Sequence, residues 1–155
     1  KGTGADSQPL GIYSTSGVNE VTIPSSGWDL ETCQTFEKKI RESNDYSDNL
    51  TWVMNTHTLF LLQRTPYSST AVNEFLVDKD HKCLGYPVVI CNALPNDGVI
   101  LGNFNELLVG EYDGMRIDVM VDASLNRKQA REVQAFASFD CIVRRLKSFS
   151  VSKPE

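Results

Sequence analysis

Four short β-rich runs between positions 84 and 121 constrain the fold of this chain most strongly. Gly, Pro, Asn and Asp separate the runs, and these residues supply the backbone angles of turns while being depleted in strands. The runs occupy 84–95, 99–104, 107–112 and 115–121. We expect them to form one compact antiparallel sheet.

The last two runs are joined by Asp113 and Gly114. Both residue types tolerate the positive φ that a type I′ turn requires, so this dipeptide predicts a two-residue hairpin. In the run that follows, Ile117 and Val119 alternate with polar residues, which is typical of a strand with one buried face. The run 88–91 is apolar on both faces, and we expect it in the middle of the sheet.

Two helices are predicted before this stretch, at 26–43 and 56–63. Ser26 is expected to cap the first together with Asp29, and Asn55 is expected to cap the second. The residues expected to face the sheet are Leu30, Cys33, Phe36 and Ile40 in the first helix, and Leu59, Phe60 and Leu62 in the second. A strand is predicted between the helices, at 50–54. The sheet should therefore be covered by helices.

The remaining segments are a mixture of loops and extended chain. The range 64–73 contains Pro66 and a Ser/Thr cluster, which indicates an exposed loop; 74–78 is expected to be a short strand and 122–131 a loop. The range 132–144 alternates apolar and polar residues for longer than the usual strand. We expect an arm-like strand that pairs with something beyond the small sheet.

The composition excludes several classes of protein. A chain of 155 residues fits one domain with a real core, and no apolar run approaches the ~18–20 residues that cross a bilayer. The net charge of −5 argues against a dedicated nucleic-acid binder. Charge is uneven, because 122–155 carries seven basic residues against four acids whereas 84–121 carries one against five. This asymmetry would suit neighbouring copies meeting positive to negative, or simply two solvated faces of a monomer.

No motif predicts catalysis, a cofactor or a metal. The segment 2–4 (Gly-Thr-Gly) follows no strand and opens no helix, so it does not fit a phosphate loop. His81, Cys83 and Cys91, with His57, are the nearest approach to a metal or nucleophile set, but zinc sites use four converging ligands, usually as close pairs. The four cysteines form no CxxC pair, and we expect reduced core cysteines. Acids such as Asp78/Asp80 and Glu111/Asp113 read as solvated turn residues. The chain is expected not to be an enzyme.

Several motifs, in order, resemble one family. "GTG…QPLGI" near the start, "WVMN", "GYPVVICNALP", "GVILGNF" and "FDCIVRRLKSFSV" are similar to the C-terminal half of tailed-phage major capsid proteins with the HK97 fold. The resemblance implies an α+β fold, with a central mostly antiparallel or mixed sheet flanked by helices and a long return strand. It implies a crossover segment at 1–21, an axial domain at 22–121 and a returning peripheral-domain strand at 122–155. It also implies a fragment lacking the N-terminal arm, extended loop and spine helix, with the natural partners of the long strand among the missing parts and the loop at 64–73 approaching a capsomer axis.

The function implied by the resemblance is structural. Identical subunits would assemble into pentamers and hexamers of an icosahedral shell that encloses DNA, in a virion made in the bacterial cytoplasm. Scaffold, portal and decoration proteins would be further partners, without sequence-specific nucleic-acid binding or membrane attachment. The alternative is a small soluble α+β module that binds a protein or peptide through an exposed edge strand, such as 132–144.

Overall fold

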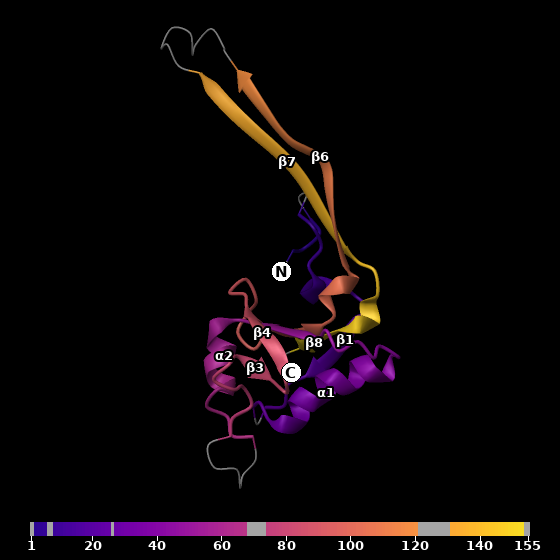
Figure 1. The fold of residues 1–155 in the computed structure, drawn as a ribbon, viewed down its shortest axis with the longest axis vertical. Coiled ribbons are helices and arrows are strands. Elements are labelled where there is room, and N and C mark those ends of the chain that lie inside the picture. Colours follow the sequence, from indigo (N-terminus) through magenta and orange to yellow (C-terminus); the bar gives the residue numbers. More distant parts are fainter. Residues whose placement is uncertain (1, 6–7, 26, 68–73, 121–130, 154–155) are drawn as a thin grey trace.

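The computed structural model describes residues 2–5, 8–25, 27–67, 74–120 and 131–153. They form a body, made of a six-stranded sheet with two helices, and a two-stranded arm that projects from it (Figure 1). The elements in chain order are η1 (Ile12–Ser14), β1 (Asn19–Thr22), α1 (Leu30–Glu42), β2 (Thr51–Met54), α2 (Thr56–Leu62), β3 (Lys82–Cys83), β4 (Tyr86–Ile90), β5 (Val99–Gly102), η2 (Phe104–Glu106), β6 (Leu107–Met120), β7 (Glu132–Val143), η3 (Leu146–Ser148) and β8 (Phe149–Lys153).

The sheet of the body is mixed, with strand order β1-β8-β5-β2-β4-β3. The pairs β1/β8 and β2/β4 are parallel, whereas β8/β5, β5/β2 and β4/β3 are antiparallel. The first and last strands of the chain are thus neighbours, so chain ends far apart in sequence close one side of the sheet. The predicted class, α+β with a mixed central sheet and flanking helices, is confirmed.

The core lies on both faces of this sheet. Strand β5 shows how, because its residues alternate between two clusters: Val99 and Leu101 join the larger one, and Ile100 joins the smaller one. The larger cluster contains most of the predicted apolar faces of α1 and α2, with Phe60 as the exception. The smaller one is closed by the turns η1, η2 and η3, whose Ile12, Tyr13, Phe104 and Leu146 pack against it. The body is therefore filled on both sides.

Helix caps follow local side-chain chemistry. Asn55 caps α2 as predicted, since its side chain accepts a hydrogen bond from the Thr58 N–H at 2.8 Å. Helix α1 begins at Leu30, and its cap is Asp29, which accepts from the Thr32 N–H at 2.7 Å. The predicted start at Ser26 is therefore wrong; Ser26 itself lies outside the described residues. Phe60 does not pack down as expected, because 61% of its surface is exposed.

The predicted antiparallel sheet of four consecutive runs is also wrong. Strand β2 separates β4 from β5, and β6 leaves the body altogether. Strand β4 is bordered by the two-residue strand β3 rather than lying centrally, and its Val89 and Ile90 are 50% and 49% exposed. Within this run, Val88 packs against the larger core cluster, whereas Val89 and Ile90 face solvent.

The Asp113-Gly114 hairpin is the clearest correction. Both residues have the positive φ that the dipeptide predicts, 62° and 65°, but the chain does not reverse there. Instead β6 continues through them, and its pairing with β7 steps from Tyr112↔Ser138 to Arg116↔Phe136. The dipeptide forms a bulge. The two-residue turn with positive φ lies instead at Leu84 and Gly85, between β3 and β4.

The expected segment boundaries do not coincide with the two sheets. Strand β6, from the range 22–121, pairs with β7 in the arm, and β8, from 122–155, is inserted in the sheet of the body. The long strand predicted at 132–144 is present as β7, and within the described residues it pairs with β6. The short strand predicted at 74–78 is reduced to two isolated bridges, Pro66↔Phe75 and Val77↔Cys83. Most of the predicted loop at 122–131 and residues 68–73 of the loop at 64–73 lie outside the described residues.

Candidate assembly surface

The arm, β6 and β7, sorts its side chains onto two faces. Strand β7 is continuous from Glu132 to Val143, so its odd-numbered residues share one face and its even-numbered residues the other. Paired residues of an antiparallel ladder lie on the same face, which extends this division to β6. At the bulge, β6 advances four residues while β7 advances two, so the alternation stays in phase.

One of these faces, which we call the apolar face, carries a single charged side chain, Glu111, among the paired residues. Its members are Leu107, Val109, Glu111, Ile117 and Val119 of β6 and Val133, Ala135, Ala137, Phe139, Cys141 and Val143 of β7. The other, the mixed face, carries both apolar and polar residues: Leu108, Gly110, Tyr112, Arg116, Asp118, Met120, Glu132, Gln134, Phe136, Ser138, Asp140 and Ile142. The alternation predicted for 132–144 is confirmed. Strand β6 contributes further apolar residues to the same face.

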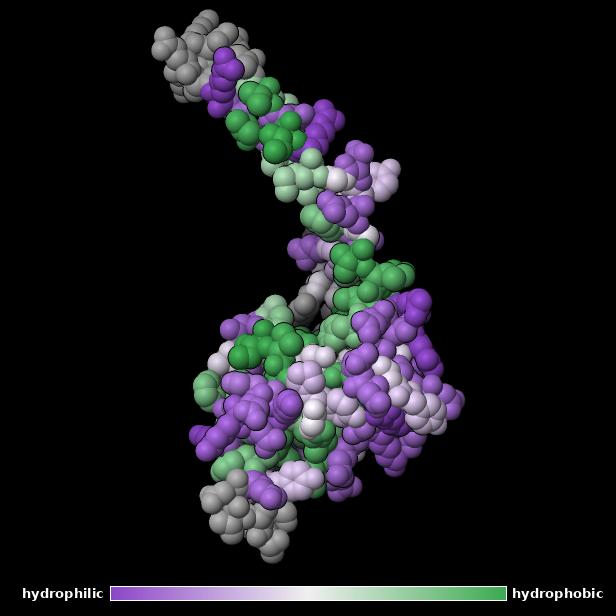
Figure 2. All heavy atoms as spheres, in the orientation of Figure 1, coloured by the Kyte–Doolittle hydropathy of each residue, from purple (hydrophilic) through white to green (hydrophobic). Residues whose placement is uncertain are grey.

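The apolar face is open to solvent. Val109, Ile117 and Phe139 are 68%, 62% and 56% exposed, and Figure 2 shows hydrophobic residues recurring along the arm outside the body. Fourteen residues of β6 at ~3.3 Å each give an arm of roughly 45 Å. An isolated two-stranded ribbon is at best marginally stable in water, and an exposed apolar patch of this kind marks an interaction site. The exposed apolar area therefore indicates that the arm binds another surface.

The base of the arm is fixed to the body by polar contacts. Arg144 donates two hydrogen bonds to the Glu106 carboxylate, at 2.7 and 2.8 Å, and its backbone N–H donates to the Glu106 carbonyl at 2.8 Å. The hydrogen bonds from Arg144 lower the pKa of Glu106. The next residue, Arg145, donates to the carbonyls of Ser43 and Asn44 at 3.0 and 3.2 Å, at the end of α1. These contacts fix the positions at which β6 leaves the body and β7 returns to it.

The N-terminal segment runs beside β7. The Cys141 thiol lies 3.8 Å from the Leu10 carbonyl, and Gln8 and Pro9 line a shallow groove with residues 137–140. A Cβ added to Gly2 would lie 1.8 Å from the Pro9 carbonyl oxygen, so glycine is needed there for close approach of two backbones. This gives the Gly2 of the Gly-Thr-Gly segment a structural reason.

The residues considered for metal or nucleophile chemistry do not converge. His57 and His81 are exposed, Cys83 is fully buried and Cys91 is partly buried. Among the described residues, no three His, Cys, Asp or Glu side chains are arranged to hold a metal ion. All four cysteines are free thiols. In the same part of the chain, no helix has the length and apolar character needed to cross a membrane.

The charge asymmetry noted in the sequence has an internal component. Strands β6 and β7 come from the acidic and the basic segment, and they pair with each other. The contact of Glu106 with Arg144 at the base of the arm joins one residue from each segment. Part of the opposite charge is thus matched within one molecule.

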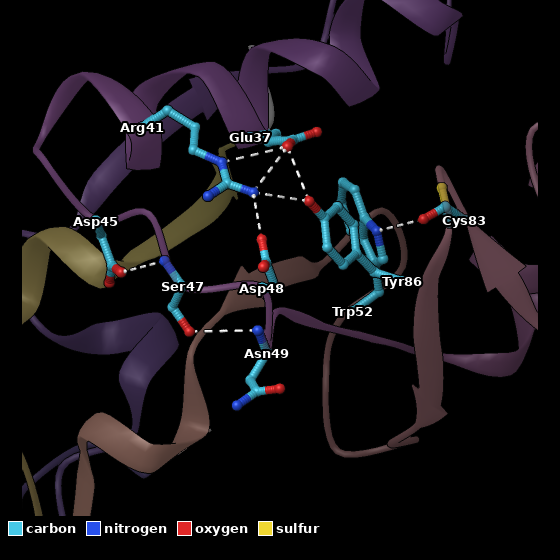
Figure 3. A network of polar contacts seen from close by, with 9 residues as sticks. All are labelled: Glu37, Arg41, Asp45, Ser47, Asp48, Asn49, Trp52, Cys83 and Tyr86. Carbon is cyan, nitrogen blue, oxygen red and sulfur yellow. Dashed lines mark hydrogen bonds and ion pairs between the residues drawn. The ribbon is translucent and has the colours of Figure 1, made fainter.

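A second polar cluster holds α1 against β4 (Figure 3). The Tyr86 hydroxyl donates to the Glu37 carboxylate at 2.9 Å and accepts from the Arg41 guanidinium at 3.0 Å, while Arg41 also lies 3.6 Å from Asp48. Burial raises the pKa of Tyr86, and its hydrogen bond to Glu37 adds to the effect. The cluster is satisfied internally and positions the helix on the sheet.

Several solved shell proteins share this fold. The chain aligns with the capsid of the native GTA particle (TM-score 0.68, 14% identity, 94% of this chain and 56% of the other) and with Mycobacterium phage Che8 (TM-score 0.64, 14% identity, 88% and 53%). It also aligns with the encapsulin complex of Synechococcus elongatus PCC 7942 (TM-score 0.58, 12% identity, 93% and 56%). The chain therefore spans little more than half the length of these structures.

The sequence comparisons are more specific. No curated protein matches the chain. The model of the phage capsid family, in contrast, matches residues 1–153, which is nearly the whole chain. The fold agrees with this match over the body and the arm alike. The chain belongs to the phage capsid family.

Proposed function

We propose that this chain is part of the building block of an icosahedral phage shell, in which identical subunits form pentamers and hexamers that enclose DNA. The observation that carries the proposal is the apolar face of the arm. It is too long and too exposed for a ribbon that stays in water, and burial of apolar area is the main driving force of association. Membership of the phage capsid family supports the same role.

The mechanism of such a role is geometric. The body has a core cluster on each face of its sheet, and the arm extends away from it as a two-stranded ladder (Figure 1). Head-to-tail contacts between identical subunits close into rings when the rotation between neighbours fits the symmetry. We assign the body to the axial domain and the arm to the peripheral domain of the complete subunit.

The proposed role is structural rather than enzymatic. It requires no cofactor and no metal, and its energy comes from many small contacts rather than from a reacting group. Scaffold, portal and decoration proteins would be the further partners, and synthesis would take place in the bacterial cytoplasm.

Two neighbouring residues of β7 allow a matched test. Phe139 lies on the apolar face and Ser138 on the mixed face, and both are exposed. We expect Phe139→Glu, introduced into the complete gene product, to abolish particles, because a carboxylate would have to be buried. We expect Ser138→Glu to leave them intact. Sedimentation and negative-stain electron microscopy after expression in bacteria provide the measurement, and nuclease-protected DNA in particles from lysed host cells would show what they enclose.

The outcome also separates the alternative role. Rings or hollow shells from the unmodified protein, lost in Phe139→Glu alone, would support the capsid proposal. A uniformly small, monomeric particle from the unmodified protein would contradict it. In that case the open edge of the arm would favour a module that binds a peptide by strand addition.

A further inference from the structure

Two of the four cysteines, Cys33 of α1 and Cys83 of β3, are buried in the same core cluster. The hydrogen bond from the Tyr86 hydroxyl to Glu37 joins α1 to the hairpin formed by β3 and β4. Cys33 lies four residues before Glu37, on the same side of the helix. Cys83 is the ladder partner of Tyr86, so both side chains leave the same face of the hairpin. The two cysteines therefore lie in one core cluster, on the helix and the hairpin that this hydrogen bond joins.

Their surroundings hold this arrangement in place. Cys33 and Cys83 are both fully buried in the larger core cluster. The Trp52 indole donates to the Cys83 carbonyl at 3.0 Å, and the Trp52 ring lies 5.4 Å from that of Phe36, one turn beyond Cys33. The hydrogen bond with the Cys33 thiol, followed by burial, raises the pKa of Cys83. The Cys83 thiol is therefore held in its protonated, unreactive form while the core is closed.

The other two cysteines are not part of this arrangement. Cys91 follows the end of β4 and Cys141 lies in the arm, and both are partly exposed.

A bond between these thiols would add a covalent link to the chain between α2 and β4. The chain between α2 and β4 is tied by the isolated bridges Pro66↔Phe75 and Val77↔Cys83 and by the burial of Leu76 and Val77. Cys83 is the last residue of this excursion before the turn into β4. A link to Cys33 would join the excursion covalently to α1.

We propose that Cys33 and Cys83 form an intramolecular disulfide when the protein passes from a reducing to an oxidising environment. A small-molecule disulfide is the oxidant. One cysteine thiolate attacks it and releases one thiol, and the second cysteine then displaces the other thiol from the mixed disulfide. Two protons and two electrons leave the cysteines, and two small thiols are formed. The chemistry does not require shell assembly; its use as a lock set after the particle leaves the cell rests on the proposed function.

The test is made on the Cys91→Ser/Cys141→Ser double variant of the complete gene product, in which Cys33 and Cys83 are the cysteines remaining from this chain. It is incubated with oxidised glutathione, with and without low urea to open the excursion, and free thiols are then alkylated. We expect the oxidised protein to take up no alkyl group at Cys33 or Cys83 and to be about 2 Da lighter than the reduced protein before alkylation. A peptide map should show the 33–83 link. Because the loop closed is about fifty residues long, we expect Tm to rise by roughly 10 °C. Cys33→Ser, added to the same variant, should abolish the mass change.

Two results would overturn the proposal. The first is two alkylated thiols at Cys33 and Cys83 after oxidation in both conditions. The second is a link that forms with a lower Tm, since this would show that the native positions do not accommodate it. Loss of particles in the assembly test leaves the mass measurement unaffected, so the two proposals fail separately.

Discussion

The capping residues of the two helices differ in how many hydrogen bonds their side chains make. Asp29 and Asn55 both accept a hydrogen bond from the backbone N–H three residues ahead. Asp29 is exposed, whereas Asn55 is buried and its amide also donates to the Pro95 carbonyl at 3.1 Å and to Asn96 at 3.0 Å. We therefore expect exchange between Asp and Asn to be tolerated at position 29 and to be destabilising at position 55.

At Asp29 we expect stability to depend on the hydrogen-bond acceptor and not on the negative charge. We expect Asp29→Ala to lower the free energy of unfolding by about 1 kcal/mol at pH 7, and Asp29→Asn to change it by less than about 0.5 kcal/mol. Hydrogen bonds from the Thr32 side chain and backbone lower the pKa of Asp29 in the folded state. Its contribution is therefore complete above the unfolded pKa of ~3.9 and is lost as pH falls through the lower folded value. Denaturant unfolding of both variants between pH 2 and 7 checks this; a gap to Asp29→Ala that stayed constant to pH 2 would contradict it.

At Asn55 the donor is essential as well. We expect Asn55→Asp to keep the cap but to place a carboxylate against two oxygen acceptors, at a cost of roughly 2–4 kcal/mol. Asn55→Ala is the reference, because it removes the cap and the donors without adding a charge. Thermal unfolding should rank the wild type first, Asn55→Ala second and Asn55→Asp last at pH 7. An Asn55→Asp variant as stable as the wild type would mean that the contacts to Pro95 and Asn96 carry no weight.

Whole elements show where sequence reasoning succeeds and where it stops. Leu59 and Leu62 of α2, the apolar stripe of α1 and the alternation of β7 were all predictable, because local periodicity decides which face is buried. The positive φ at Asp113 and Gly114 was predictable too. What that conformation does was not, because a bulge and a hairpin differ only in whether a distant strand continues the ladder.

The missed elements depend on long-range partners in the same way. Leu84 lies in the actual turn with a φ of 50°, a conformation that is costly for leucine and that only the flanking pairing enforces. The insertion of β8 between β1 and β5 joins segments more than a hundred residues apart, and no local pattern encodes it. The assembly surface was predicted only in part: the alternating face of 132–144 was identified, but its pairing with β6 was not.

The bulge can be tested as an element. A Cβ added at Gly114 would meet nothing within 4 Å, so the cost of a substitution there is conformational. We expect Gly114→Ala to weaken the arm locally by about 1 kcal/mol, because its φ is 65°. Asp113→Gly, at a φ of 62°, is the matched control and should not weaken it. Hydrogen exchange of arm peptides, compared with peptides from the body, gives the measurement; equal exchange in both variants would show that the strain is relieved elsewhere.

At the scale of the molecule, the arm and the body differ in how they are stabilised. None of the fully buried residues of the two core clusters comes from β6 or β7, and in the arm only Val143, at its base, packs against a cluster. The body holds its own apolar core, whereas the arm depends on contacts that it makes elsewhere. This division fits a subunit that must be folded before assembly and completed by it.

The division predicts that the arm can be removed. The Arg144 N–H donates to the Glu106 carbonyl at 2.8 Å, and their side chains are hydrogen-bonded, so residues 107–143 can be replaced by an Asn-Gly turn between the two. We expect the body to fold with a Tm within about 5 °C of the intact chain, since none of the buried core residues of the described chain lies in β6 or β7. It should remain monomeric in light scattering, whereas the intact chain should associate through its apolar face with rising concentration. An unfolded product would show that the arm contributes to the folding of the body. A product that still associated would show that the assembly surface lies on the body. The exposed Val89 and Ile90 of β4 would then be the next residues to substitute.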